Sequence, residues 1–205
     1  MLDRKPYHHG DRRRALLGAS LDLIREAGIH AFTLREVARR AGVSHAAPYR
    51  HFRDKAELLA AVAEEGFDRL TAAMRAAAAK SQEPFECLQN AGLAYIEFAQ
   101  EHPEHFLVMF TVNVDENLHP SAKAAAHRCF AALLALVTVS QDARQLAGMR
   151  PETATRIAWT QVHGIAELAL RGQLGFGNKQ ELREFAKLAT QVFGCGLQLT
   201  ASCQC

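Results

Sequence analysis

The sequence of 205 residues predicts an all-α protein. Hydrophobic residues make up 49% of the chain, and Val and Ile occur singly rather than in the alternating runs that are typical of strands. Apolar residues instead recur at helical spacing, as Leu17, Leu21 and Ile24 do near the N-terminus. Residues that start and stop helices separate these segments, so we expect a succession of helices along the chain.

The first predicted helix covers residues 11–27 and follows a basic, flexible arm over residues 1–10. A proline and a glycine interrupt regular structure in the arm. Asp11 suits the start of the helix, and Gly28 suits the position just after its end.

Two short helices are expected next. Thr33 and the glutamate three residues later form a capping box that starts one helix, and Gly42 ends it. Ser44 can cap the third helix. Pro48 must lie near the start of that helix, because a proline inside a helix removes a hydrogen bond and clashes with the preceding turn. We therefore expect the third helix to run from Ser44 to about residues 51–52.

The rest of the chain is predicted to be helical as well. Asp54 is expected to cap a fourth helix, which reaches the alanine-rich stretch 76–79. The further predicted helices cover residues 84–101, 104–110, 121–140, 151–173 and 179–198. Pro103 stops the first of them, and Asn178 suits the start of the last. Polar residues 111–119 are expected to form a loop.

Charge is distributed unevenly along the chain. Residues 1–53 carry eleven Lys or Arg and five Asp or Glu, a net charge of +6, whereas residues 54–205 carry a net charge of −4. A basic head on an acidic body favours a polyanion as the partner of the head. A solvated basic face is the alternative interpretation of the same pattern.

Residues 33–52 combine a capped helix, a turn with a glycine and a second short helix, which is the pattern of a helix-turn-helix. In this motif the second helix lies in the major groove of double-stranded DNA, and its early side chains contact base edges. Residues 45–47 occupy that place, and Arg50 can bind guanine. Hydroxyl and basic side chains at the helix starts suit phosphates. The predicted DNA-contacting residues are Thr33, Arg35, Ser44, His45, Ala46, Ala47, Tyr49, Arg50, His51 and Lys55.

Residues 11–60 resemble the DNA-binding region of the TetR family of bacterial transcription regulators. The resemblance rests on the leading helix, the runs AGVS (41–44) and YRHF (49–52), and Lys55 at the start of the next helix. In the body, Trp159-x-x-x-His163-Gly164 is similar to the Trp-His-Gly signature of one subgroup of the family's C-terminal domains. The remainder matches the family only in length and helical character.

The resemblance implies about nine helices: a three-helix helix-turn-helix domain over residues 1–55, and an effector-binding and dimerisation domain over residues 56–205. It also implies a homodimer on a palindromic operator, acting as a repressor that an unknown small-molecule effector releases from DNA. A ligand-independent regulator or activator of the same fold is the alternative. No pattern in the sequence identifies the operator, the effector or the target genes, decides between repressor and activator, or places the arm in the minor groove.

Two sets of residues in the body are candidates for the implied roles. Aromatic and polar-tipped side chains suit an effector pocket, with core packing as the alternative for each. They are Tyr95, Phe98, His102, Phe106, Met109, Phe110, Trp159 and His163. The last two predicted helices carry more apolar residues than one core stripe needs, which favours a dimer interface over a monomer core. The interface candidates are Ile165, Leu168, Ala169, Phe185, Leu188, Ala189, Val192 and Phe193.

Other function classes find little support in the sequence. It has no Gly-x-Ser-x-Gly elbow, phosphate-binding glycine loop or dinucleotide fingerprint, so we expect no enzyme activity, catalytic residue or cofactor. No His or Cys spacing matches a zinc site, so we expect no metal, although His8-His9 and Cys203-x-Cys205 leave a metal or thiol sensor open. Scattered cysteines, a charged N-terminus and the lack of a stretch of about 18–20 apolar residues favour a cytoplasmic protein without a membrane partner.

Overall fold

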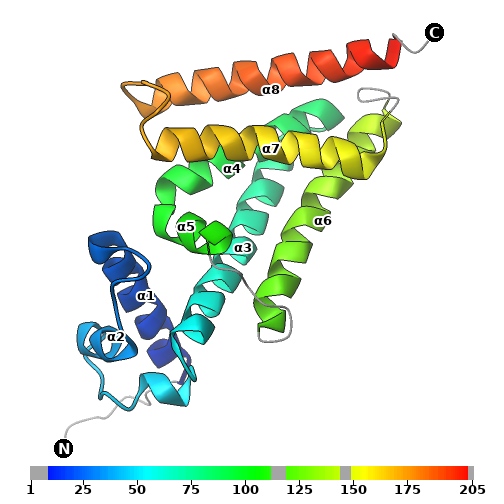
Figure 1. The fold of residues 1–205 in the computed structure, drawn as a ribbon. Coiled ribbons are helices and arrows are strands. Elements are labelled where there is room, and N and C mark those ends of the chain that lie inside the picture. Colours follow the sequence, from blue (N-terminus) through cyan, green and yellow to red (C-terminus); the bar gives the residue numbers. More distant parts are fainter. Residues whose placement is uncertain (1–8, 112–118, 144–148, 203–205) are drawn as a thin grey trace, which may run out of the picture. The chain divides into compact units, whose positions relative to one another are not determined.

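The computed structural model describes residues 9–111, 119–143 and 149–202, with side chains within residues 12–192 of these ranges. Every regular element there is a helix, which confirms the predicted all-α fold (Figure 1). The elements are α1 (His9–Ala27), α2 (Leu34–Arg40), the 3-10 helix η1 (Pro48–Arg50), α3 (Lys55–Ala78), α4 (Pro84–Glu101), α5 (Pro103–Thr111), α6 (Pro120–Asp142), α7 (Pro151–Leu170) and α8 (Lys179–Ser202).

Helix α1 begins at His9, two residues before the predicted start at residue 11, so His9 and Gly10 belong to the helix and not to the arm. The remaining arm residues, 1–8, lie outside the described residues, and so do residues 203–205. The arm, His8 and the Cys203-x-Cys205 pair are therefore outside the part of the chain that the structure describes.

The third predicted helix is shorter than expected. Only Pro48–Arg50 is helical, as η1, and residues 45–47 form turns. The Ala47 N–H donates to the Ser44 carbonyl at 2.9 Å, and the His51 N–H donates to the Pro48 carbonyl at 2.9 Å, so both bonds span three residues rather than four. Pro48 has no N–H to donate to Ser44, which interrupts the α-helical hydrogen-bond ladder in its first turn.

Gly172 ends α7 three residues earlier than predicted. Its φ is 66°, a conformation that favours glycine. Its N–H donates to the Ala169 carbonyl at 3.0 Å, and the Gln173 N–H donates to the Leu168 carbonyl at 2.9 Å. These are the two bonds of a Schellman motif, which satisfies the last carbonyls of the helix and turns the chain away from it.

The described residues form two compact units. The first includes residues 1–66 and 104–123, and the second includes residues 67–103 and 124–205. This division differs from the boundary expected after residue 55, because α3 continues unbroken and α5 belongs with the first unit. A Cβ atom at Gly66 of α3 would lie 2.5 Å from Met109 Sδ of α5, so their close approach requires a residue without a side chain.

The core of the first unit joins α1, α2 and the start of α3. Leu16, Val37 and Leu58, one from each helix, are fully buried. The Arg25 Nε of α1 also donates to Glu104 Oε1 of α5 at 2.6 Å. These contacts fix the helices that carry the predicted DNA-contacting residues.

In the second unit, α7 and α8 pack against α4. Gly92 of α4 permits the approach, since a Cβ atom there would lie 3.3 Å from Val162 Cγ1 of α7 and 3.8 Å from Thr190 Cγ2 of α8. Gln161 Nε2 donates to the Ala189 carbonyl at 2.8 Å and joins α7 to α8. Figure 1 shows these two helices side by side.

Helix α6 is more apolar than we expected from the sequence. By length and composition it is the one helix among the described residues that could cross a membrane, a test that core helices of soluble proteins also pass. Its buried residues Cys129, Leu133 and Val137 recur every four positions and form one packed face. Arg128, next to this face, binds Asp68 of α3 at 2.8 Å within the second unit.

Candidate nucleic-acid interface

The segment of residues 44–51, between α2 and α3, presents the predicted base-contacting residues at the surface of the first unit. Ser44, His45, Ala46, Tyr49 and Arg50 are exposed, and Ala47 and His51 are half-buried. Pro48 and Phe52 are buried and anchor η1 in the core of the unit. The Arg13 guanidinium of α1 lies 5.8 Å from the centre of the Phe52 ring. The segment is thus anchored at Pro48 and Phe52, and its exposed residues before and between these anchors are open to a partner.

Helix α2 begins at the predicted capping box, which the structure confirms. Thr33 Oγ1 accepts the Glu36 N–H at 3.3 Å, and the Thr33 N–H donates to Glu36 Oε2 at 2.7 Å. Hydrogen bonds from the Thr33 hydroxyl and N–H lower the pKa of Glu36. Gly42, with a φ of 66°, ends the helix in the predicted way. Both ends of α2 are therefore set by local sequence, and Arg35 is exposed in its first turn.

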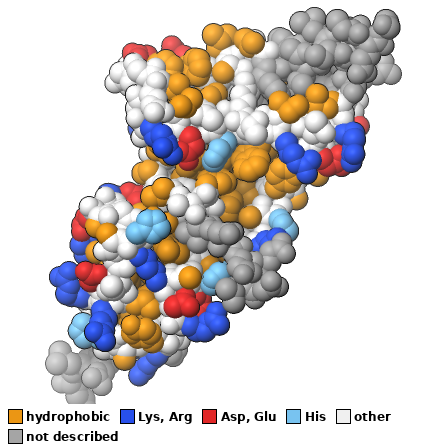
Figure 2. All heavy atoms as spheres, viewed as in Figure 1, with side chains coloured by type: hydrophobic (Ala, Val, Ile, Leu, Met, Phe, Trp, Pro, Cys, Tyr) orange, Lys and Arg blue, Asp and Glu red, His pale blue; other side chains and the backbone are white. Residues whose placement is uncertain are grey.

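The exposed arginines of the first unit divide into paired and unpaired ones. Arg40 binds Glu26 at 2.5 Å, and Arg53 binds Glu57 at 3.2 Å. Three others have no carboxylate partner within the described part of the chain: Arg14, Arg35 and Arg50. Figure 2 shows basic side chains spread over the surface of this unit. The unpaired guanidinium groups leave positive charge available to a polyanion.

Lys55 has a structural role that the sequence did not reveal. Its Nζ donates to the carbonyls of His30 and Phe32 at 3.0 and 2.9 Å and lies 4.0 Å from the centre of the Phe32 ring. Partial burial lowers the pKa of its ammonium group. Lys55 thereby ties the start of α3 to the chain between α1 and α2, and one of its three N–H groups remains for a phosphate.

The predicted effector-pocket residues are divided between the two units. Phe106, Met109 and Phe110 belong to the first unit, where the rings of Phe106 and Phe110 lie 4.9 Å apart. The other five, Tyr95, Phe98, His102, Trp159 and His163, belong to the second unit. That all eight line one pocket therefore stays a prediction.

Three of these residues meet between α4 and α7. Tyr95 Oη lies 2.8 Å from His163 Nδ1, and Trp159 Nε1 donates to the same hydroxyl at 3.2 Å. Burial raises the pKa of Tyr95 and lowers the pKa of His163, so both side chains are neutral at pH 7. We refer to Tyr95, Trp159 and His163 as the polar triad.

Three hollows in the second unit are lined by other residues. One of about 290 Å³ lies between α4 and α8, and one of about 230 Å³ lies beside the loop between α7 and α8. The third, of about 30 Å³, is almost wholly apolar and includes Leu88, Gly92, Leu133 and Val162. None of these three hollows includes a residue of the predicted effector pocket.

Four of the eight predicted dimer residues form an exposed apolar face on α7 and α8. Leu168, Phe185, Leu188 and Val192 are exposed, Leu188 and Val192 by 60% and 62%. Ala169 and Ala189 are half-buried, and the Phe193 side chain lies outside the described residues. Ile165 is only 8% exposed, because it faces the core of the unit, so it does not belong to this face. Figure 2 shows hydrophobic side chains gathered over the first half of α8.

Within the described residues, no group of three or more His, Cys, Asp or Glu side chains could hold a metal ion. Cys87 and Cys129 are free thiols. Burial raises the pKa of Cys129, which keeps it in the unreactive thiol form.

The fold and this interface define a helix-turn-helix DNA-binding protein with a separate helical body. Residues 16–62 match the family described as "Bacterial regulatory proteins, tetR family", and residues 88–193 match the "Tetracyclin repressor-like, C-terminal domain". The protein belongs to the TetR family of bacterial regulatory proteins. Its membership of the Trp-His-Gly subgroup stays a prediction.

Two named transcription regulators match part of the chain each. The HTH-type transcriptional activator FasR of Mycolicibacterium smegmatis is 28% identical over 130 residues, which cover 62% of this chain and 59% of FasR. The HTH-type transcriptional regulator BetI of Klebsiella pneumoniae is 50% identical over 50 residues, 24% of this chain and 26% of BetI. The chain thus spans less than two thirds of the length of each of these relatives.

Solved structures resemble the protein over most of its length. A protein of unknown function from Rhodococcus sp. RHA1 is 34% identical, with a TM-score of 0.83 over 95% of this chain and 100% of that chain. FadR from Bacillus subtilis in complex with stearoyl-CoA is 14% identical, with a TM-score of 0.74 over 89% of this chain and 98% of that chain. The second likeness shows a shared fold alone.

Proposed function

We propose that this protein is a homodimeric transcription repressor, which binds a palindromic operator in double-stranded DNA and is released by a small-molecule effector. The observation that carries the proposal is the exposed segment 44–51 beside unpaired arginines on a compact helical support. A cytoplasmic location, and the absence of enzyme activity, of a resident cofactor and of a metal, belong to the same proposal.

In the proposed complex, the segment 44–51 enters the major groove. His45 and Ala46 come first in the segment and reach base edges. The Ala46 side chain can contact a thymine methyl group, and the His45 ring can donate a hydrogen bond to a base or accept one from it. Arg50 binds guanine. Phosphates on either side are bound by Thr33, Arg35, Ser44, Tyr49 and Lys55, with Ala47 and His51 beside the groove. Phosphate contacts set the register of the protein, and base contacts select the operator.

The exposed apolar face of α7 and α8 supports a homodimer. Two copies that bury Leu168, Phe185, Leu188 and Val192 against each other remove apolar surface from water, which is the main driving force of association. The two segments 44–51 of such a dimer must lie about 34–36 Å apart to enter successive major grooves.

The polar triad supports an effector site in the second unit. Tyr95, Trp159 and His163 place donors and acceptors among apolar helices, as in small-molecule pockets. The nearby apolar hollow of about 30 Å³ has room for little more than water, so an effector larger than water must separate α4 from α7. Such a ligand shifts the protein toward the separated form only if it binds that form more tightly.

An activator of the same fold is the second candidate function. The relative FasR is named a transcriptional activator, and a repressor and an activator would dock the same segment on DNA. The position of the operator relative to the promoter distinguishes the two.

The test is a selection of binding sites from random duplex DNA with the purified full-length protein at two salt concentrations. Phosphate contacts make the affinity fall steeply as salt rises, so the lower salt concentration reveals weak binding. A recovered palindrome with two half-sites would support a dimeric, sequence-specific regulator. If no sequence is enriched at either salt concentration, the operator proposal is wrong.

A further inference from the structure

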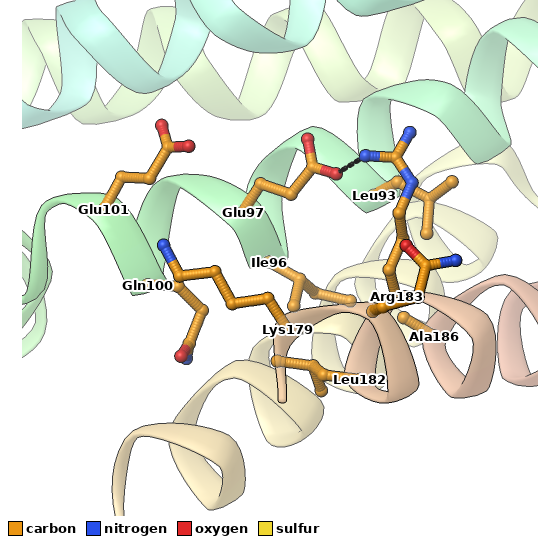
Figure 3. Close-up of a pocket in the computed structure, with 10 residues that line it drawn as sticks. Leu93, Ile96, Glu97, Gln100, Glu101, Lys179, Leu182, Arg183 and Ala186 are labelled. Carbon is orange, nitrogen blue, oxygen red and sulfur yellow. Dashed lines mark hydrogen bonds and ion pairs between the residues drawn. The ribbon is translucent and has the colours of Figure 1, made fainter. Parts of the chain in front are cut away.

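The hollow between α4 and α8 is used by neither the proposed DNA interface nor the polar triad (Figure 3). Its volume of about 290 Å³ lies near the lower end of the range for small-molecule pockets. The floor is apolar and the rim is polar. The floor consists of Leu93, Ile96, Leu182 and Ala186, and the rim of Glu97, Gln100, Glu101, Lys179, Gln180 and Arg183.

The charges on the rim are of both signs and only partly paired. Glu97 of α4 binds Arg183 of α8, and Figure 3 shows this ion pair at one end of the hollow. Within the described residues, neither Glu101 nor Lys179 has an ion-pair partner. In Figure 3 the Lys179 side chain extends from α8 toward α4, with its ammonium group on the side of Glu101. The hollow therefore offers one carboxylate and one ammonium group to a ligand.

Gln100 adds a second, independent observation. Its Nε2 is buried and has no hydrogen-bond partner in the part of the chain that the structure describes. A buried donor without an acceptor is costly, whereas rotation of the amide toward the hollow breaks no hydrogen bond at this nitrogen. Gln100 and Lys179 also line the neighbouring hollow of about 230 Å³, so the two hollows adjoin at these residues. A ligand oxygen beside Gln100 would satisfy the donor.

We propose that this hollow binds an amino carboxylic acid in its zwitterionic form. The ligand carboxylate binds the Lys179 ammonium and the Gln100 amide, and the ligand ammonium binds Glu101. The hydrocarbon part of the ligand covers the apolar floor at Ile96 and Leu182. A simple anion would face two glutamates and a simple cation would face Lys179 and Arg183, so a ligand with both charges fits best.

The first test is isothermal titration calorimetry on the full-length protein without DNA. The probes are the α-amino acids, one by one, and the ω-amino acids from 3-aminopropionate to 6-aminohexanoate, which vary the separation of the two charges. We expect at least one to bind with a Kd below about 1 mM, and propionate and propylamine to bind at least about tenfold more weakly. The proposal is overturned if no probe binds or if propionate or propylamine binds as tightly as the zwitterion.

The second test uses single variants of the two unpaired rim residues. We expect Lys179→Met and Glu101→Gln each to weaken the binding at least about tenfold. Both side chains are exposed, so the variants should fold, which the thermal midpoint confirms. Lys187→Met, on the same helix but outside the hollow, is the matched control and should bind as the parent does. Unchanged binding in both rim variants contradicts the proposal, whatever the selection of DNA sites gives.

Discussion

Tyr95 Oη lies 2.8 Å from His163 Nδ1 at the contact between α4 and α7. The Trp159 indole N–H donates to the same Tyr95 oxygen at 3.2 Å. Since the phenol has a single proton, it can accept from Trp159 and still donate to His163, provided that Nδ1 is the unprotonated nitrogen of the imidazole. A positively charged His163 could not accept this bond, so its neutral form belongs to the native packing of the second unit.

This hydrogen bond predicts that the free energy of unfolding depends on pH through His163, and that the His163→Asn variant lacks this dependence. Burial lowers the pKa of His163 in the folded protein, so below about pH 6.5 the unfolded chain binds a proton that the folded chain resists. The parent should therefore lose free energy of unfolding relative to His163→Asn as the pH falls from 7.5 to 5.5. Asparagine can still accept from Tyr95 and does not titrate. Urea unfolding at both pH values measures the difference.

The control for this prediction is His127→Asn, because His127 is exposed on α6. Its stability should follow that of the parent at both pH values. If the free energy of unfolding changes equally with pH in the parent and in His163→Asn, the folded protein does not resist protonation of His163.

The capping box predicts a loss of stability that depends on one hydroxyl group. Thr33→Ala removes the acceptor of the Glu36 N–H and should lower the free energy of unfolding by about 1 kcal/mol. Thr33→Ser keeps the oxygen and should lie within about 0.5 kcal/mol of the parent. Guanidinium unfolding followed by circular dichroism measures both, and an equal loss in the two variants would assign the effect to the missing methyl group.

The sequence predicted the parts of the fold that local chemistry determines. The capping box at Thr33, the glycine end of α2 and the cap at Asp54, whose Oδ1 accepts the Glu57 N–H at 2.8 Å, depend on neighbours within four residues. The effect of Pro48 was predicted only in part. Its place near a helix start was right, but the loss of its N–H leaves a 3-10 turn instead of an α-helix.

Contacts between residues that are far apart in the chain could not be predicted from the sequence. Lys55 binds carbonyls 23 and 25 residues away, and no residue pattern marks a lysine that anchors a backbone. Ile165 and Leu168 are both apolar and only three residues apart, yet one is buried and the other exposed. Helical periodicity identifies apolar residues without saying whether the core or a second chain covers them.

The ion pair between Arg25 and Glu104 predicts an asymmetric response to substitution. Burial is the largest single influence and would raise the pKa of Glu104, but the hydrogen bond and the charge of Arg25, together with a backbone hydrogen bond, outweigh it and the pKa is lowered. Arg25→Gln leaves a carboxylate in the interior without this partner, whereas Glu104→Gln leaves an arginine that water can solvate. We expect Arg25→Gln to be the more destabilising of the two at pH 7.

The ion pair between Arg25 and Glu104 also predicts how the stability of the protein changes with pH. In the parent, the lowered pKa of Glu104 contributes stability above about pH 4.5, and this is lost as the pH falls through the lowered value. In Arg25→Gln, protonation of Glu104 relieves the buried charge, so the deficit against the parent should shrink between pH 7 and pH 4.5. Thermal unfolding of both proteins across this range measures it, and a deficit that grows toward low pH would contradict the assigned role.

The exposed face of α7 and α8 predicts that one charge abolishes the dimer. Leu188→Glu places a carboxylate in the middle of the apolar face, and in a symmetric dimer the two copies would bring two such charges together. We expect a monomer of unchanged helix content that binds operator DNA at least about tenfold more weakly. Sedimentation velocity measures the mass. The control is Lys187→Glu at the adjacent exposed position, which should remain a dimer. If Leu188→Glu is also a dimer, the interface lies elsewhere.

The unpaired arginines predict two different effects on DNA binding. Arg50 is proposed to contact a base, so Arg50→Ala should cost about 1–3 kcal/mol on the selected operator and relax the preference at one base pair. Arg35 is proposed to contact a phosphate, so Arg35→Ala should weaken all sequences alike and reduce the slope of log K against log salt by about 1. Arg156→Ala, an exposed site on α7, changes the net charge equally and should change neither quantity. Fluorescence anisotropy at several salt concentrations separates the cases, because a base contact changes the sequence preference and a phosphate contact changes the salt slope alone.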